Sequence, residues 1–302
     1  MILVAGSANL DFVVRADHIP APGETVLGRE FKTFPGGKGA NQAVASARAG
    51  GVPTAMLLAL GDDAFATPLE ASLNEAGVQL HIKRAEDQPT GTAFICVSDD
   101  AENAITVAPG ANNTLGPADL PDLAGVTHLV MQLETPLASV SAYARAARAR
   151  GVKVVLNAAP AQTLPAGLLA DLDVLIVNEG ELAVVAAHSG SASSSVEENL
   201  AKLDVPCVVV TLGSHGSLAR VGGTRVGGTI VRQAAFPITP VDTTGAGDTF
   251  VGSFVAALSQ GATLPDALKQ ASAASALACL TPGAQSSIPT RAQVRDFLNQ
   301  QH

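Results

Sequence analysis

The sequence predicts an α/β fold, with a central and mostly parallel sheet flanked by helices and a small β-sheet lid. Short apolar runs alternate with alanine-rich stretches along most of the 302 residues, and that alternation is typical of βαβ units around a parallel sheet. Two segments, at about 10–35 and 90–109, break the rhythm. Apolar and polar residues alternate there between turn residues, as in half-exposed antiparallel strands. We expect these segments to form the lid and residues 1–302 to form a single domain.

Six apolar runs are the predicted strands of the main sheet, and predicted helices follow the first five. In chain order they are ILVAG, then 40–49; TAMLLAL, then 63–76; THLVMQL, then 136–150; KVVLNAA, then 164–170; VLIVN, then 179–188; and CVVVTLG near 207–213. A polar, serine-rich stretch at 188–199 predicts a surface loop and a helix that begins near Ser195 or Val196.

The composition excludes several classes of function. A formal charge of -9 would repel a nucleic-acid backbone, and one Tyr, nine Phe and no Trp leave little surface on which bases can stack. The opening residues MILVAGSANLD lack a basic segment and reach Asp11 too early for a secretory signal. No uninterrupted apolar run reaches the length of about 18 residues that a membrane span needs. We therefore expect a cytoplasmic protein that binds neither nucleic acid nor membrane. The three cysteines are far apart in the sequence and predict no disulfide or zinc site.

The stretch VDTTGAGDTF, at 241–250, predicts a phosphate site. Gly245, Ala246 and Gly247 come just before a predicted helix that ends near Gly261. Free N–H groups at a helix N-terminus bind phosphate, and glycines allow its close approach. Asp248 beside them can either complement the helix dipole or accept the proton of a hydroxyl. We favour the second interpretation and expect phosphoryl transfer, although no Walker motif is present.

A second glycine cluster, GGKGAN at 36–41, also precedes a predicted helix. Glycine permits tight turns and the close approach of a ligand to the backbone. The residues alone leave both interpretations open.

An ordered series of motifs resembles that of the PfkB carbohydrate kinase family. The motifs are GSANLD at 6–11, PGETV at 22–26, GGKGANQA at 36–43, TGTAF at 90–94, MQLETP at 131–136, NEGE at 178–181, TLGSHG at 211–216 and DTTGAGDTF at 242–250. Among them GSANLD, GGKGANQA and MQLETP resemble the ribokinases of this family. The resemblance spans most of the chain and implies a central sheet flanked by helices with a β lid.

The resemblance also implies the site residues. Asp248 is the expected catalytic base, and it also belongs to the expected substrate-binding and ATP-binding sets. The other expected sugar-binding residues are Asn9, Asp11, Gly37, Lys38, Gly39, Ala40, Asn41 and Glu134. The other expected ATP-binding residues are Asn178, Thr211, Leu212, Gly213, Ser214, His215, Gly216, Gly247 and Ser272. The expected anion hole consists of Gly245, Ala246 and Gly247.

Two cations are implied in the same way. Glu181 would hold Mg²⁺ through water, since Mg²⁺ keeps several waters and takes few protein ligands. An activating monovalent cation, usually K⁺, would lie near Asp242, Thr244, Ala278, Thr281, Gly283 and Ser287. The sequence departs from the ribokinase pattern at Ser272, where a His is common, and at Thr281-Pro282, where a basic pair is expected. His215 stands at a variable family position, and we expect its side chain on the loop surface.

The expected reaction is ATP-dependent phosphorylation of the primary 5-hydroxyl of D-ribose, by a homodimer joined through its lids. Kinases of the family that act on deoxyribose, fructose, a nucleoside or a sugar phosphate are alternatives. A phosphosugar pocket would need several cations, and only Lys38 accompanies the pocket motifs, whereas Phe12, Phe31, Phe34 and Phe94 leave a nucleoside possible. A catalytically silent sugar-binding protein is a further alternative, but binding alone needs no general base at position 248.

Overall fold

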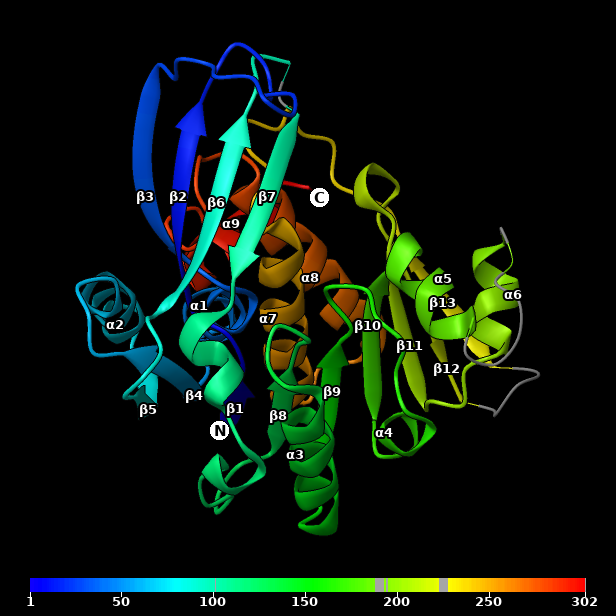
Figure 1. Ribbon diagram of the computed structural model, residues 1–302. Coiled ribbons are helices and arrows are strands. Elements are labelled where there is room, and N and C mark those ends of the chain that lie inside the picture. The colour runs from blue at the N-terminus through cyan, green and yellow to red at the C-terminus, as the bar shows by residue number, and fades with distance from the viewer. Residues whose placement is uncertain (101, 188–192, 194, 223–227, 302) are drawn as a thin grey trace.

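The main sheet orders its strands as β13-β12-β11-β10-β9-β8-β1-β4-β5 in the computed structural model (Figure 1). The structure describes residues 1–302 except 101, 188–192, 194, 223–227 and 302. The parallel strands are β1 Ile2–Ala5, β4 Thr54–Gly61, β5 Gln79–Ala85, β8 His128–Met131, β9 Lys153–Asn157, β10 Val174–Asn178 and β11 Cys207–Thr211. Two antiparallel strands, β12 Ser217–Val221 and β13 Thr229–Gln233, extend one edge. The predicted fold class is confirmed.

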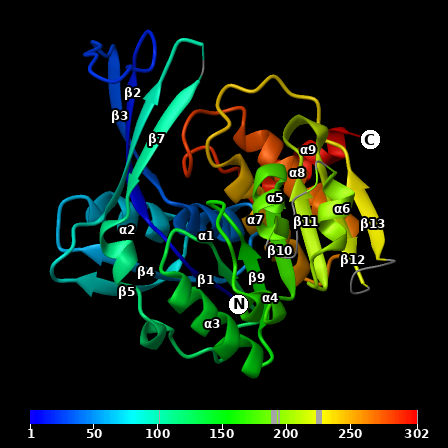
Figure 2. The ribbon, with the colours of Figure 1, turned by 45° about the vertical axis from the view of Figure 1, so that its right-hand side comes forward.

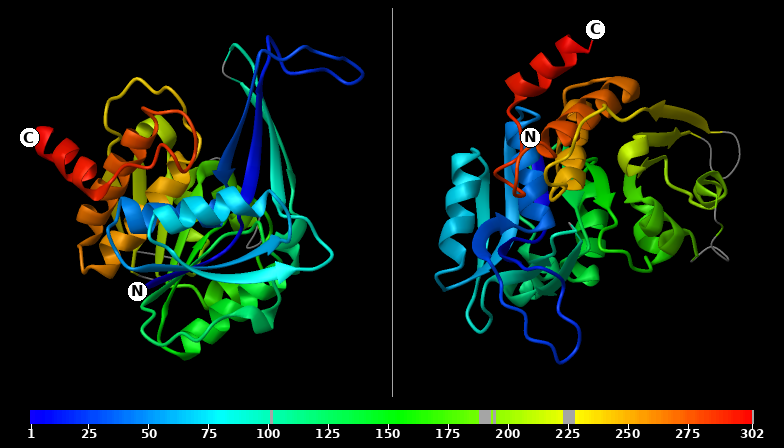
Figure 3. Two further views of the ribbon diagram at one scale, coloured as in Figure 1. Left: turned by 90° about the vertical axis from the view of Figure 1, so that its left-hand side faces the viewer. Right: turned by 90° about the horizontal axis from the view of Figure 1, so that it is seen from above.

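Helices cover both faces of this sheet because both faces of its strands are apolar. In β1, Ile2 and Val4 pack into one hydrophobic core, and Leu3 and Ala5 pack into the other. The first core contains residues of α1 Lys38–Arg48, α2 Ala66–Glu75, α7 Ala246–Ser259, α8 Leu264–Ala278 and α9 Arg291–Gln300. The second contains residues of α3 Leu137–Ala149, α4 Ala166–Ala170, α5 Glu179–Ala187 and α6 Val196–Ala201. The left view of Figure 3 shows α9, in red, on the side of the body away from the lid.

A second sheet, of order β3-β2-β6-β7, projects from the body as the lid (Figure 2). Its strands are β2 Asn9–Arg15, β3 Glu30–Gly36, β6 Gly91–Val97 and β7 Asn103–Ala108. β2 pairs antiparallel with β3, and β6 pairs antiparallel with β7, as the alternating sequence indicates. The two pairs join through parallel pairing of β2 with β6. Asn9 and Asp11 therefore lie on one face of β2, at the base of the lid.

Several elements differ from the sequence prediction. The first long helix begins at Lys38 rather than at residue 40, because Gly37, with φ = 91°, is its N-cap. The helix after the serine-rich stretch begins at Val196 as predicted, with Ser195 Oγ accepting from Glu198 N at 3.3 Å. Residues 188–192 and 194 of the predicted loop lie outside the described residues. The alternation did not indicate the parallel strand β5, the antiparallel strands β12 and β13, or the last two helices.

Helices α1 and α7 pack with their backbones almost in contact. A Cβ atom on Gly252 of α7 would lie 2.5 Å from Gln42 O and 2.6 Å from the Cβ of Ala45. A Cβ atom on Gly50, after α1, would collide with the Cβ of Ala256. Only glycine permits this approach. It places the first turn of α1 beside the first turn of α7.

Candidate active site

The first turn of α7 offers backbone N–H groups that have no partner. Gly245 precedes the helix with φ = 73°, a left-handed conformation that glycine adopts without strain. Among the residues that the structure describes, the N–H groups of Gly245, Gly247 and Asp248 donate no hydrogen bond. The N–H of Ala246, by contrast, donates to Thr243 O at 3.2 Å. The free groups and the positive end of the helix dipole can together bind a phosphate.

Asp248, in the same turn, accepts a hydrogen bond at each carboxylate oxygen. Asn41 Nδ2 donates to Asp248 Oδ2 at 2.9 Å, and Gln42 Nε2 donates to Asp248 Oδ1 at 2.9 Å. The side chain is 9% exposed. Two amide donors hold its carboxyl group in one orientation, which is what a general base for a hydroxyl needs.

Gln42 belongs to a chain of buried amides that the sequence analysis missed. Its Nε2 also donates to Asn157 Oδ1 at 3.0 Å, and its Oε1 accepts from Gln132 Nε2 at 2.6 Å. Asn157 Nδ2 in turn donates to the backbone carbonyl of Ile176 at 3.1 Å. That carbonyl can only accept, so it fixes the orientation of each amide in turn and requires an acceptor at Asp248. The motifs GGKGANQA and MQLETP contain Gln42 and Gln132, but nothing local in the sequence shows that the two side chains meet.

Charged side chains from three other elements surround this turn. Burial raises the pKa of Asp11 to about 7, with Glu134 and Asp248 adding to the effect and Lys38 opposing it. The negative charge of Asp248 raises the pKa of Lys38, and this effect is larger than the opposing effect of burial. Burial raises the pKa of Glu181, although the backbone N–H of Asn178 and the charge of Lys38 act to lower it. The four predicted carboxylates Asp11, Glu134, Glu181 and Asp248 therefore all lie close enough to Lys38 to act on its charge.

Glu134 also caps helix α1. Its Oε2 accepts from Ser7 Oγ at 2.5 Å and from the N–H of Lys38 at 3.1 Å, while Gly39 N donates to Ser7 Oγ at 3.3 Å. The carboxylate thus joins the end of β8 to the start of α1. A Cβ atom on Gly39 would lie 2.6 Å from Ser7 N, and Ala40 is fully buried. The predicted residues 37–40 therefore contribute backbone at the pocket wall.

The predicted nucleotide loop lies at the carboxyl ends of β10 and β11. Asn178 and Thr211 are cross-strand neighbours, and the residues after Thr211 form a tight turn in which Leu212 N donates to Gly216 O at 2.8 Å. Gly213–His215 form a short 3₁₀ helix, and Ser214 and His215 are exposed. His215 therefore lies on the surface of the loop, as expected. Ser272 is buried on α8, one turn before Ser275, whose Oγ donates to Ala246 O at 2.9 Å.

Asn178 and Glu181 form a capping box at the start of α5. Asn178 N donates to Glu181 Oε2, and Glu181 N donates to Asn178 Oδ1, each at 2.8 Å. This reciprocal pairing satisfies two helix-end donors. The N-x-x-E spacing therefore has a structural role as well as any role toward a ligand.

The six positions expected around a monovalent cation come from two hydrogen-bonded segments. Val241 N and Asp242 N donate to Cys279 O, and Asp242 accepts from Thr244 N and Gly283 N at 2.9 Å each. Ala278 O accepts from Thr281 N at 3.4 Å, and Ser287 Oγ donates to Ala284 O at 2.9 Å. Burial alone would raise the pKa of Asp242, but the N–H groups of Gly283 and Thr244 outweigh it and lower that pKa.

Neither a preformed metal cluster nor a membrane-spanning helix is present among the described residues. No three or more His, Cys, Asp or Glu side chains gather in a way that would hold a metal ion. Within the same residues, none of the helices is long and apolar enough to cross a membrane.

Comparison with known proteins gives consistent matches over the full length. The model of the pfkB family carbohydrate kinases matches residues 1–291. A ribokinase of Haemophilus influenzae is 37% identical over 98% of both chains, and a deoxyribokinase of Salmonella typhi is 31% identical over 99% of this chain and 98% of the other. The structure of Arabidopsis thaliana ribokinase complexed with ribose and ATP superposes with a TM-score of 0.88, at 32% identity and 98% coverage of both chains. The chain belongs to the pfkB family of carbohydrate kinases.

Proposed function

We propose that this protein is a ribokinase that transfers the γ-phosphoryl group of ATP to the primary 5-hydroxyl of D-ribose, giving ribose 5-phosphate and ADP. One observation carries the proposal: Asp248 is held by amides of α1 beside free N–H groups at the start of α7. Similarity to ribokinases at 32–37% identity supports the choice of ribose.

Each part of the site has a role in this reaction. Asp248 accepts the proton of the attacking hydroxyl, because its side chain is buried and held in one orientation by two amide donors. The N–H groups of Gly245 and Gly247 stabilise the charge that develops on the transferring phosphoryl group. Asn9, Asp11 and Asn41 bind the sugar hydroxyls. Phosphoryl transfer depends mainly on positioning and electrostatics, so this rigid arrangement is what the reaction requires.

The residues present fit the two implied cations. Glu181 is close enough to Lys38 and Asp248 for their charges to act on it. A single carboxylate is adequate for Mg²⁺, because ATP phosphates and water would supply most of its ligands. Mg²⁺, when bound, would neutralise charge on those phosphates. Asp242 is anchored by the N–H groups of Thr244 and Gly283, which places a carboxylate between the two segments, and K⁺ takes oxygen ligands. Asp242, Thr244, Ala278, Thr281, Gly283 and Ser287 are the proposed K⁺ positions.

The test is an ADP-release assay with ribose, deoxyribose, fructose and adenosine, each with and without K⁺. We expect ribose to give the highest kcat/KM and K⁺ to raise it. The Asp248→Asn variant should fold and bind ribose while kcat falls by at least about a thousandfold. Turnover near that of the unaltered enzyme would refute the role of Asp248.

Deoxyribose is the second candidate substrate, because the Salmonella typhi relative at 31% identity is a deoxyribokinase. The same assay separates the two sugars. A higher kcat/KM with deoxyribose than with ribose would replace the first proposal by this one.

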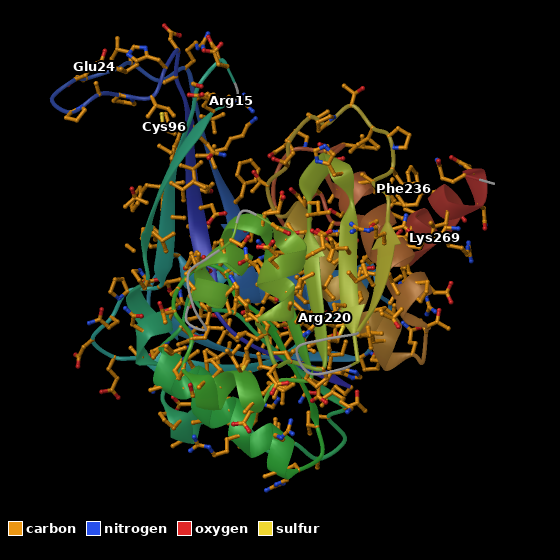
Figure 4. The ribbon with its side chains drawn as sticks, turned by 90° about the vertical axis from the view of Figure 1, so that its right-hand side faces the viewer. Arg15, Glu24, Cys96, Arg220, Phe236 and Lys269 are labelled. Atoms are coloured by element: carbon orange, nitrogen blue, oxygen red, sulfur yellow. The ribbon has the colours of Figure 1, made fainter. Side chains whose placement is uncertain are left out.

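The lid supports a proposal about assembly. Its outer face carries a cluster of aromatic rings, in which Phe12 stacks on Phe31 and on Phe94 at centroid distances of 6.0 and 5.4 Å. Phe31 is 62% and Phe94 54% exposed, and they border a hollow of about 430 Å³ that Cys96 also lines. Figure 4 shows Cys96 on the lid, far from the body. We propose that this face joins two copies of the chain into a homodimer, since exposed apolar patches of this kind mark interfaces. We also propose that the enzyme acts in the cytoplasm, where ATP is available, and that residues 1–302 act as one domain.

A further inference from the structure

Asn112 connects the lid to the sugar pocket through a fixed pattern of hydrogen bonds. It is 1% exposed and lies in the 3₁₀ helix Gly110–Thr114, where the chain leaves lid strand β7 (Figure 2). Its Oδ1 accepts from Ala8 N at 3.0 Å, and its Nδ2 donates to Ala8 O at 3.2 Å. A backbone N–H only donates and a carbonyl only accepts. The pairing with Ala8 therefore fixes which end of the Asn112 amide is oxygen and which is nitrogen.

The same nitrogen determines the orientation of the next side chain. The second hydrogen of Asn112 Nδ2 is donated to Asn9 Oδ1, at 2.8 Å. Since Nδ2 has no acceptor capacity, the Asn9 atom that faces it must be the oxygen. The Ala8 backbone thus determines the orientation of the Asn112 amide, which in turn determines that of the Asn9 amide. The nitrogen of Asn9 points away from Asn112.

The Asn9 nitrogen borders open space. Asn9 as a whole is 2% exposed, yet among the described residues its Nδ2 has no hydrogen-bond partner and is not one of the side-chain atoms that are sealed from solvent without a partner. Its cross-strand neighbours in β3 and β6 are Gly36 and Gly91, which bring no side chain of their own. Asp11 lies on the same face of β2. The free N–H groups of Asn9 are therefore open to a ligand on the face of β2 that also carries Asp11.

Gly91 keeps the contact between Asn9 and Asn112 closed. A Cβ atom at Gly91 would collide both with Asn112 Nδ2 and with Asn9 Oδ1. A side chain at this position would have to push the two amides apart. Glycine at 91 and asparagine at 112 thus act on the same hydrogen bond.

We propose that Asn112 is a positioning residue that makes Asn9 a donor-only contact for the sugar, and this rests on the proposed function. The free N–H groups of Asn9 then require an acceptor oxygen on the sugar, and the carboxyl oxygens of Asp11, two residues along the strand, can accept from a sugar hydroxyl. A hydroxyl-bearing sugar satisfies both at once. A site of this kind discriminates strongly against an analogue that lacks the oxygen.

The main test is Asn112→Asp, with Asn113→Asp as the matched control. Asn113 is in the same 3₁₀ helix but exposed. The carboxylate at 112 has no hydrogen to donate to Asn9 Oδ1, so the Asn9 amide loses its fixed orientation. We expect KM for ribose to rise about tenfold or more, with kcat and KM for ATP within about threefold. Asn113→Asp should match the unaltered enzyme.

A second readout separates positioning from general damage to the fold. KM is measured for ribose and for its 2-deoxy and 3-deoxy analogues. In the unaltered enzyme, loss of the hydroxyl that meets Asn9 raises KM. In Asn112→Asp, the rise in KM caused by removing this hydroxyl should become smaller. The rise in KM caused by removing the other hydroxyl should stay the same. Equal penalties in both enzymes, for both analogues, would overturn the proposal.

Gly91→Ala provides an independent variant should Asn112→Asp fail to fold. It retains both asparagines but pushes their amides apart, so we expect the same loss of discrimination against one deoxy analogue. Retention of the full penalty would again overturn the proposal. An unaltered enzyme that phosphorylates none of these sugars would instead refute the proposed function, and ribose binding measured by calorimetry on the same variants would then test Asn112 by itself.

Discussion

Replacing Gln42 by Leu removes the donor that holds Asp248 Oδ1 while keeping the size of the side chain. Asn41 still donates to the other oxygen. The carboxylate should then swing away from the orientation in which it meets the hydroxyl. We expect kcat to fall while KM for the sugar changes little, because the substitution leaves the predicted sugar contacts at Asn9 and Asp11 in place.

The size of the effect follows from the contacts that are lost. A hydrogen bond to a charged group contributes about 1.5–3 kcal/mol, and each 1.36 kcal/mol is a factor of ten in rate, so kcat should fall about 10- to 100-fold. The substitution also leaves Gln132 Nε2 and Asn157 Oδ1 without the partner that they have at 2.6 and 3.0 Å. Burying two unpaired groups should lower the free energy of unfolding by about 2–6 kcal/mol.

The assay is steady-state ADP release against ribose concentration, together with urea unfolding of the same samples. Gln260→Leu is the control. Gln260 caps the far end of α7, the helix that begins near Asp248, and the substitution removes its hydrogen bonds to Gly50 O and Ala256 O, each at 3.1 Å. The control should lower stability but leave kcat within about threefold. A folded Gln42→Leu enzyme with the kcat of the control would refute the reasoning. A shift of the acid limb of the kcat profile to higher pH in Gln42→Glu would support it.

Three further predictions follow from single contacts. Asp11→Asn should stabilise the protein at pH 8 by up to about 4 kcal/mol and change its stability little at pH 4. The pKa of Asp11 is about 7 in the folded protein and 3.8 ordinarily, so ionisation of Asp11 lowers stability as the pH rises. Equal shifts in urea unfolding at both pH values would contradict this. Gly247→Ala should fold normally, since nothing lies within 4 Å of the added Cβ, yet lower kcat/KM for ATP about tenfold by crowding the phosphate, while the equally open Gly167→Ala should not. Phe94→Glu should convert a dimer to a monomer in sedimentation, and a mass unchanged by the substitution would remove the lid face as the interface.

Much of the fold could be predicted because its signals are local. The alternation of apolar runs with alanine-rich stretches indicated the parallel strands and the helices between them. The turn before α7 was predictable from Gly245, whose left-handed conformation few other residues adopt. The outermost strands β5 and β13 were missed because most of their side chains are half-buried or exposed, and β12 was missed because its run SLARV is short and contains a charged Arg. β5, for example, reads QLHIKRA and resembles a polar loop.

The interior of the site could not be predicted, because its contacts join residues that are distant in sequence. Gln42 and Asp248 are 206 positions apart, and Gln42 and Asn157 are 115 apart. Nothing near Gln42 or Asn112 distinguishes them from ordinary helix or loop amides. Asn178 and Glu181 show the opposite case, since a spacing read as a ligand element is also a capping box.

The near-contact of α1 with α7 has a consequence for how the enzyme can change. Because Gly252 leaves no room for a methyl group against Gln42 O, the amides of Asn41 and Gln42 and the carboxylate of Asp248 are held together as one rigid block. Adaptation to a different sugar must then come from the strands and turns that face this block. We expect evolved or engineered variants with altered sugar preference to carry their substitutions in the lid and its hinge, and to leave the helix pair untouched.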